Sequence, residues 1–156
     1  MFFIDVPEIV FNNRQNIPWE DVETLLKGLI GREIVVKHYG DIIHIAGDFP
    51  DEYTESKYTK KLRGALAKAK ANAGQIIEKL IEHAVNRRWV ENKDPKHKKE
   101  ANGGWYRYDV GFTIPVNENG KCRKNSYTGT IVVRIKNEKL YLYDLINIKK
   151  ETSTPL

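Results

Sequence analysis

Several polar side chains in the C-terminal third have the chemistry needed to cleave RNA without a metal. In such cleavage a general base removes the 2′-hydroxyl proton, an acid protonates the leaving 5′-oxygen, and a cation stabilises the charge on the phosphate. Histidine is the usual acid or base near neutral pH, arginine binds two phosphate oxygens, and aromatic rings stack on bases. The basic, hydroxyl and aromatic side chains concerned are His97, Arg107, Thr130, Arg134, Tyr141 and Tyr143.

These residues also have structural interpretations. His97 lies in the lysine-rich segment 93–99, where a solvated basic loop explains it as well as a catalytic role does. Arg134 lies on the polar face of a predicted strand, so a phosphate contact and a cross-strand ion pair fit it equally. Tyr141 and Tyr143 also fit a role as cover for the sheet, because tyrosine is common in strands. The sequence leaves these alternatives open.

Motifs for other chemistries are absent from the sequence. There is no phosphate-binding P-loop, dinucleotide-binding glycine motif, His-Glu-x-x-His metal motif, EF-hand loop or serine nucleophile elbow. The single Cys122 excludes an internal disulfide and a multi-cysteine zinc site. Asp48, Asp51 and Glu52 lie in a proline-containing turn and lack the spacing expected for magnesium. We therefore expect no metal and no cofactor.

Three consecutive runs, 105–114, 127–136 and 140–149, alternate with period two and predict neighbouring strands. Successive residues of a strand point to opposite faces, so the sheet should have one apolar and one polar face. The apolar face is expected to hold Tyr106, Tyr108, Phe112, Ile114, Ile131, Val133, Ile135, Leu142, Ile146 and Ile148. The polar face is expected to hold Trp105, Arg107, Asp109, Thr113, Thr130, Arg134, Tyr141, Tyr143, Asn147 and Lys149. Such a polar face suits a ligand that carries phosphate.

The chain before these strands has the pattern of helices and one hairpin. Segment 18–30 predicts a helix, and segment 33–46 predicts a hairpin. Segments 55–71 and 76–84 have helical spacing, and a short strand at 87–90 follows. Within 55–71, one side away from the apolar stripe collects Lys57, Lys60, Lys61 and Lys68, a pattern also typical of a solvated face. We predict an α+β fold with an N-terminal helix and hairpin, a helix pair and a curved antiparallel sheet.

Size and charge limit the class of protein. The 156 residues fit a single domain, with 1–50 as a helix–hairpin subregion and 51–150 as its core. The formal net charge of +5 favours an acidic partner, nucleic acid before an anionic membrane. No apolar run approaches the ~18 residues of a membrane span, and the N-terminus lacks the pattern of a secretory signal. The expected location is the cytoplasm, with delivery by a non-standard route as the alternative.

Segments 104–108, 127–134, 139–144 and 146–149 form a pattern that resembles phage-associated domains of the barnase–EndoU–colicin–RelE-like (BECR) nuclease fold. These domains occur in large polyvalent proteins and in fusions with phage portal or minor head proteins. Segments 56–64 and 80–86 look like the family's helix pair, and 149–156 looks like the tail of such modules in prophages of gut Firmicutes. The resemblance covers roughly 25–150.

The resemblance implies metal-independent RNA transesterification on the exposed face of a curved sheet, in a bacterial host cytoplasm or a virion. RNA is the implied substrate, and a phage head or portal protein or an inhibitor protein is a further implied partner. His97 matches as acid or base, Arg107 and Arg134 as phosphate clamps, and Thr130 and Tyr143 lie on the same face. Contacts with nucleic acid are expected from Lys57, Lys60, Lys61, Tyr141 and Lys149.

The sequence departs from the family where members often carry histidine, since Trp105 and Tyr106 stand there instead. A catalytically inactive member that binds nucleic acid or a virion protein is therefore the first alternative. A purely structural appendage of a head or portal protein is the second, and it predicts no salt-sensitive binding of RNA.

Overall fold

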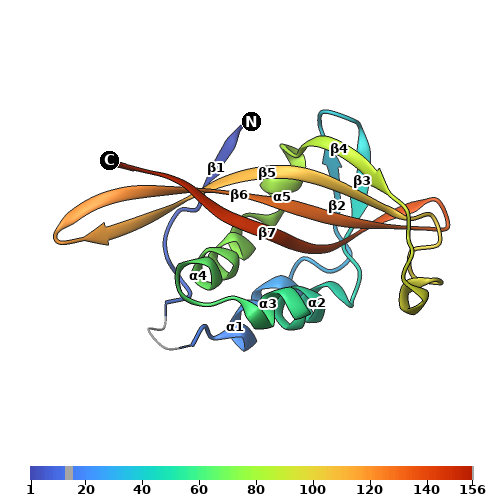
Figure 1. Ribbon diagram of the computed structural model, residues 1–156, viewed down its shortest axis with the longest axis horizontal. Coiled ribbons are helices and arrows are strands. Elements are labelled where there is room, and N and C mark those ends of the chain that lie inside the picture. The colour runs from blue at the N-terminus through green and yellow to red at the C-terminus, as the bar shows by residue number, and fades with distance from the viewer. Residues whose placement is uncertain (13–15, 156) are drawn as a thin grey trace.

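A computed structural model describes residues 1–12 and 16–155 of the chain. Within these residues seven strands form one curled, mixed sheet, and helices α2, α3 and α4 lie on one side of its central strands (Figure 1). The strands are β1 (Phe3–Asp5), β2 (Glu33–Val36), β3 (Asp41–His44), β4 (Val85–Val90), β5 (Trp105–Glu118), β6 (Lys121–Lys136) and β7 (Lys139–Pro155). The helices are α1 (Trp19–Lys27), α2 (Phe49–Glu55), α3 (Lys57–Lys61), α4 (Gly64–Ala73) and α5 (Ile77–Glu82), with short 3₁₀ turns at Gly74–Ile76 (η1) and Pro95–His97 (η2). The architecture is α+β, as the sequence predicts.

The sheet order is β1-β5-β6-β7-β3-β2, and β4 pairs with β5 beside β1. Strands β5, β6 and β7 form the predicted antiparallel meander, in which Trp105 pairs with Arg134 and Arg134 pairs with Tyr141. The prediction of a wholly antiparallel sheet is wrong, because β1 pairs with β5 and β3 pairs with β7 in parallel. The two parallel strands, β1 and β3, come from the N-terminal part of the chain. That part lies outside the three alternating runs that predicted the meander.

The predicted helix over 55–71 is wrong, since the structure divides this region into α2, α3 and α4. Ser56 is extended, and its side chain caps α3 by accepting a hydrogen bond from the Thr59 amide. Arg63 is also extended, and Gly64 follows with a φ of +59°, a conformation that glycine adopts at little cost. These breaks separate the lysines of α3 from Lys68 on α4, so they do not form one continuous helical face.

Strand β7 departs from simple alternation. Register shifts separate Thr128 from Thr130 and Val132 from Val133 on β6, and each leaves one extra residue on β7. Leu145 consequently enters the core, whereas Ile146, predicted to be in the core, is half-buried on the other face. Asn147 lies within the first irregularity with a φ of +53°, which asparagine tolerates better than most residues.

One core lies between the sheet and the helices, and its buried members run from Ile4 to Ile148. Tyr108, Val110, Phe112 and Ile114 of β5 are all buried, as the alternation predicts. Their neighbours Arg107 and Val132, which are register partners, point away from this core. Arg107 and Val132 therefore lie on the face of the meander opposite to the core.

Candidate functional site

A hollow of about 180 Å³ opens on the face of the meander that carries Arg107. Its lining comes from the loop before β5 and from strands β5, β6 and β7. The lining residues are His97, Trp105, Arg107, Val132, Tyr143, Asp144 and Ile146. Three of the predicted catalytic residues, His97, Arg107 and Tyr143, therefore meet at one place although they are far apart in the sequence.

His97 is ordered by its neighbours rather than free in a solvated loop. It ends η2, whose start is capped when the Asp94 side chain accepts a hydrogen bond from the Lys96 amide. The His97 ring lies edge-on to Trp105 and Tyr143, with centroids 5.7 and 5.8 Å away. Its Nδ1 is 3.1 Å from Oε2 of Glu100, and the side chain is 18% exposed. A carboxylate at one ring nitrogen holds an imidazole in a fixed orientation, a common feature of catalytic histidines.

Arg107 is a cation without a partner among the described residues. Its Nε is buried and makes no hydrogen bond, and no carboxylate in the described part of the chain forms an ion pair with it. The nearest acid on its strand, Asp109, is instead 3.0 Å from Arg88. An unpaired guanidinium in a hollow is well suited to bind phosphate, because it can donate two parallel hydrogen bonds.

Tyr143 supplies a phenol that stays protonated. Burial raises its pKa well above the ordinary value, and the nearby carboxylate of Glu52 raises it further. Its ring packs edge-on against Trp105, 4.9 Å between centroids. Tyr143 can therefore donate a hydrogen bond to a ligand, but it is a poor base near neutral pH.

The other two predicted catalytic residues do not line the hollow. Thr130 is buried, with 6% of its surface exposed. Arg134 is bound by both carboxylate oxygens of Asp48, which precedes α2, and its guanidinium lies 5.1 Å from the Tyr141 ring centre. The ion-pair interpretation thus describes Arg134, although the carboxylate comes from the α2 loop rather than from a neighbouring strand.

The residues predicted to bind nucleic acid are dispersed. Lys57, Lys60 and Lys61 belong to α3 in the helical layer (Figure 1), and Lys60 lines a separate cavity of about 550 Å³ with Trp19 and Arg63. Tyr141 is covered by Arg134 and lies beside His44, 5.6 Å between ring centres. Lys149 is exposed, with Nζ 3.6 Å from Glu151. None of them lines the hollow.

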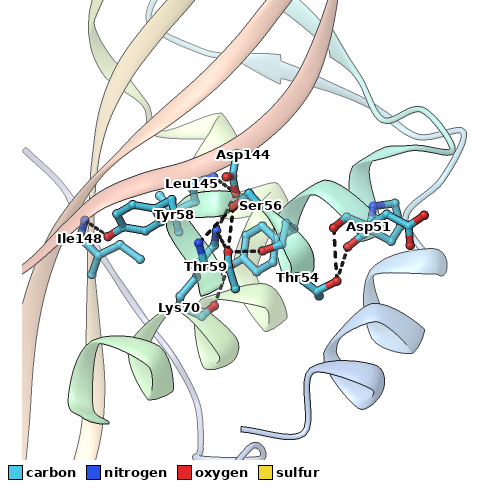
Figure 2. Close-up of polar contacts among 11 residues, drawn as sticks. Asp51, Thr54, Ser56, Tyr58, Thr59, Lys70, Asp144, Leu145 and Ile148 are labelled. Carbon is cyan, nitrogen blue, oxygen red and sulfur yellow. Dashed lines mark hydrogen bonds and ion pairs between the residues drawn. The ribbon is translucent and has the colours of Figure 1, made fainter. Parts of the chain in front are cut away.

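A buried polar cluster on the helix side of β7 was not predicted. Lys70 of α4 and Asp144 of β7 are both buried, and Lys70 Nζ lies 2.7 Å from Asp144 Oδ1 (Figure 2). Lys70 also donates to Thr59 Oγ1 at 2.5 Å, and its Nζ lies 4.6 and 5.2 Å from the ring centres of Tyr53 and Tyr58. The sequence signal was available, since Lys70 stands among the alanines of α4 and Asp144 stands between Leu142 and Leu145.

Burial dominates the ionisation of this pair. It raises the pKa of Asp144 to about 6, against the opposing effect of Lys70, and it lowers the pKa of Lys70. Asp144 Oδ1, which Lys70 contacts, also accepts a hydrogen bond from the Leu145 amide. With its charges paired and its hydrogen bonds made, the cluster fixes β7 against the helices behind the hollow.

Within the described residues no group of three or more His, Cys, Asp and Glu side chains could hold a metal ion. No helix in that part of the chain is long and apolar enough to span a membrane. Comparison of the chain with protein-family models, curated proteins and solved structures gives no match.

Proposed function

We propose that the hollow binds an RNA phosphodiester and cleaves it without a metal, as in the phage-associated BECR nuclease domains that the sequence resembles. One observation carries the proposal: His97, Arg107 and Tyr143 come from separate elements to line one hollow, and Arg107 forms no ion pair with any described residue. An α+β chain with helices behind a curled sheet is compatible with the fold that the resemblance implies. RNA is the proposed ligand, in a bacterial host or a virion.

The chemistry assigned to the hollow is transesterification. His97 takes the 2′-hydroxyl proton, the 2′-oxygen attacks phosphorus, and the bond to the 5′-oxygen breaks to leave a 2′,3′-cyclic phosphate. The 5′-oxygen leaves as a hydroxyl, with its proton supplied by solvent or by the Tyr143 phenol. Arg107 stabilises the charge that develops on the phosphate oxygens.

A catalytically inactive module that binds nucleic acid or a virion protein is the second candidate. It is favoured by the neutralisation of Arg134 and by the acids beside the hollow. A neighbouring cavity of about 340 Å³, which His97 and Tyr143 also line, holds Asp48, Asp51, Glu52, Glu55 and Glu100. These carboxylates would repel a phosphate that approached from α2.

The test is incubation of the purified chain with total RNA and with labelled oligoribonucleotides, with and without EDTA. We expect cleavage that EDTA does not inhibit, with products that end in 2′,3′-cyclic phosphate. The matched control is His97→Ala, purified in the same way, which should bind RNA but not cleave it.

Cleavage retained by His97→Ala would exclude His97 as the acid or base and would indicate either another group or a contaminating nuclease. Absence of cleavage by the wild type, with RNA binding intact, would favour the inactive binding module. Absence of both would contradict each of the two candidates.

A further inference from the structure

The cavity of about 550 Å³ in the helical layer shares no lining residue with the hollow. Its lining comes from the start of α1, from α2 and α3, and from the turn into α4 (Figure 1). The cations in its wall are Lys60, Arg63 and Lys68, and none of its described lining residues is acidic. Cavities that bind small molecules measure about 300–1,000 Å³. This cavity therefore has the size for a small ligand and a wall that favours a negatively charged one.

The positive charge at this cavity is not neutralised by the protein. None of Lys60, Arg63 and Lys68 forms an ion pair with a carboxylate in the described residues. The two other lysines of α3, Lys57 and Lys61, form none within that part of the chain either. Charges of one sign that line a concave surface concentrate their field inside it. An anionic ligand would therefore be attracted into the cavity.

Arg63 is held in position by the backbone. Its Nη1 donates hydrogen bonds of 2.7 Å to the carbonyls of both Lys60 and Leu62. No hydrogen bond from its Nε or Nη2 to a described residue accompanies them. The edge of a guanidinium that carries Nε and Nη2 can donate two parallel hydrogen bonds to two phosphate oxygens. Arg63 is thus fixed at the cavity with this edge unused.

Trp19 gives the cavity an aromatic wall. It is the first residue of α1 and is half-buried. Its side chain packs against the core and also lines the cavity. An indole that the core supports at the wall of a cavity can stack on a planar base. The cavity therefore combines an aromatic surface with three cations.

We propose that this cavity binds a nucleoside phosphate, with Arg63 and the two lysines of the wall contacting the phosphates while Trp19 stacks on the base. Both halves of such a ligand are needed to match the lining. Phosphate alone would leave the aromatic wall unused, and a neutral aromatic molecule would leave the three cations without a counter-charge. The proposal does not rest on the function proposed for the hollow.

The test is isothermal titration calorimetry of the purified chain with ADP, pyrophosphate and adenosine. ADP carries a base and phosphates, whereas each of the other two probes carries one of them, so ADP should bind most tightly. Arg63→Ala should weaken the binding of ADP and of pyrophosphate about 10- to 150-fold, the effect of losing hydrogen bonds to a charged group. The matched control Lys121→Ala removes an exposed cation at the β5–β6 turn and should bind ADP like the wild type.

A second variant separates stacking from charge. Trp19→Leu should weaken ADP binding about 5- to 150-fold and leave pyrophosphate binding unchanged, because only the base stacks. Trp19→Phe keeps a ring and should restore most of the affinity for ADP. Thermal unfolding of each variant reports whether it is folded. Arg63 is exposed, so Arg63→Ala tests the cavity even if Trp19→Leu does not fold.

Absence of ADP binding by the wild type, or equal ADP affinity of wild type and folded Arg63→Ala, would overturn the proposal. Equal affinity of the wild type for ADP and pyrophosphate would show an anion site without base recognition and would overturn the nucleotide assignment. Loss of ADP binding in Arg107→Ala instead of Arg63→Ala would place the nucleotide in the hollow and exclude the cavity. RNA cleavage without ADP binding would leave the proposed function standing while the cavity assignment fails.

Discussion

Two polar clusters meet at strand β7, where Asp144 belongs to the buried one and also lines the hollow, and they use similar side chains in opposite ways. On the helix side, Lys70 and Asp144 are buried, paired and hydrogen-bonded. On the other side, Arg107 is half-buried beside His97 and Tyr143 and has no carboxylate of its own in the described part of the chain. The charges of the first cluster are paired within the protein, whereas the second has hydrogen-bonding capacity left for a ligand.

The two arginines of the polar face repeat this contrast. Arg134 is bound by Asp48 and covers the Tyr141 ring, so its charge is neutralised within the fold. Arg107, from the neighbouring strand, forms no ion pair within the described residues, whereas the buried Nε of both arginines lacks a hydrogen bond. Residue type and strand face alone do not distinguish such arginines. What distinguishes them is whether a distant loop contributes an acid that pairs with the guanidinium.

The largest expected effect is on the buried pair. Lys70→Ala should destabilise the protein by about 3–5 kcal/mol, because it leaves the Asp144 carboxylate buried without a counter-charge. Denaturant unfolding measures the loss. The double variant Lys70→Met/Asp144→Leu removes both charges and should be distinctly more stable than Lys70→Ala. A double variant that is less stable than Lys70→Ala would show that the ion pair itself stabilises the fold.

The pH dependence of stability gives the next effect. The pKa of Asp144 is raised to about 6 by burial, so the folded state binds a proton that the unfolded state has lost between about pH 4 and pH 6. Its contribution to stability is present below that window and decreases as pH rises through it, by about 3 kcal/mol at 1.36 kcal/mol per pKa unit.

Unfolding of wild type and Asp144→Asn should be measured from pH 4 to pH 7. The difference between them reports this carboxyl together with its coupling to Lys70, whose pKa is lowered by burial and raised by Asp144. A difference that instead grows in favour of the wild type as pH rises would mean that attraction to Lys70 outweighs the cost of burial.

A smaller effect separates the two arginines. Arg134→Ala should cost about 1–3 kcal/mol, because the charge-assisted hydrogen bonds to Asp48 and the contact with Tyr141 are lost. Arg107→Ala should change stability by less than about 1 kcal/mol and should weaken RNA binding instead. Thermal unfolding and RNA-binding anisotropy on the same preparations would show that one variant loses stability and the other loses binding. Weaker RNA binding by folded Arg134→Ala would contradict this difference between the two arginines.

The elements with strong periodicity could be predicted from sequence. Alternation over β5 identified its buried residues, and the turn at 39–41 identified the β2–β3 hairpin. The division of α2–α4 was missed, because Ser56 and the Arg63-Gly64 pair are local backbone breaks within a helical pattern. The position of Ile146 was missed because extra residues in β7 shift its register, and such shifts depend on strand pairing.

The candidate site was predictable by residue type more than by position. His97, Arg107 and Tyr143 were named from sequence, but their meeting in one hollow depends on how the 91–104 loop folds over β5 and β7. The roles of Arg134 and Lys70 could not be predicted, because their partners Asp48 and Asp144 lie 86 and 74 residues away in the chain.

The most direct test of the contrast between the clusters is the single-turnover rate of oligoribonucleotide cleavage in EDTA by Arg107→Ala, beside wild type and Arg123→Ala. If the hollow acts on phosphate, Arg107→Ala should remain folded and lose about 10²–10³-fold in rate, the usual cost of removing one group that stabilises transition-state charge. Arg123→Ala should cleave like the wild type. Equal rates for wild type and Arg107→Ala would contradict the assignment of the hollow as the active site.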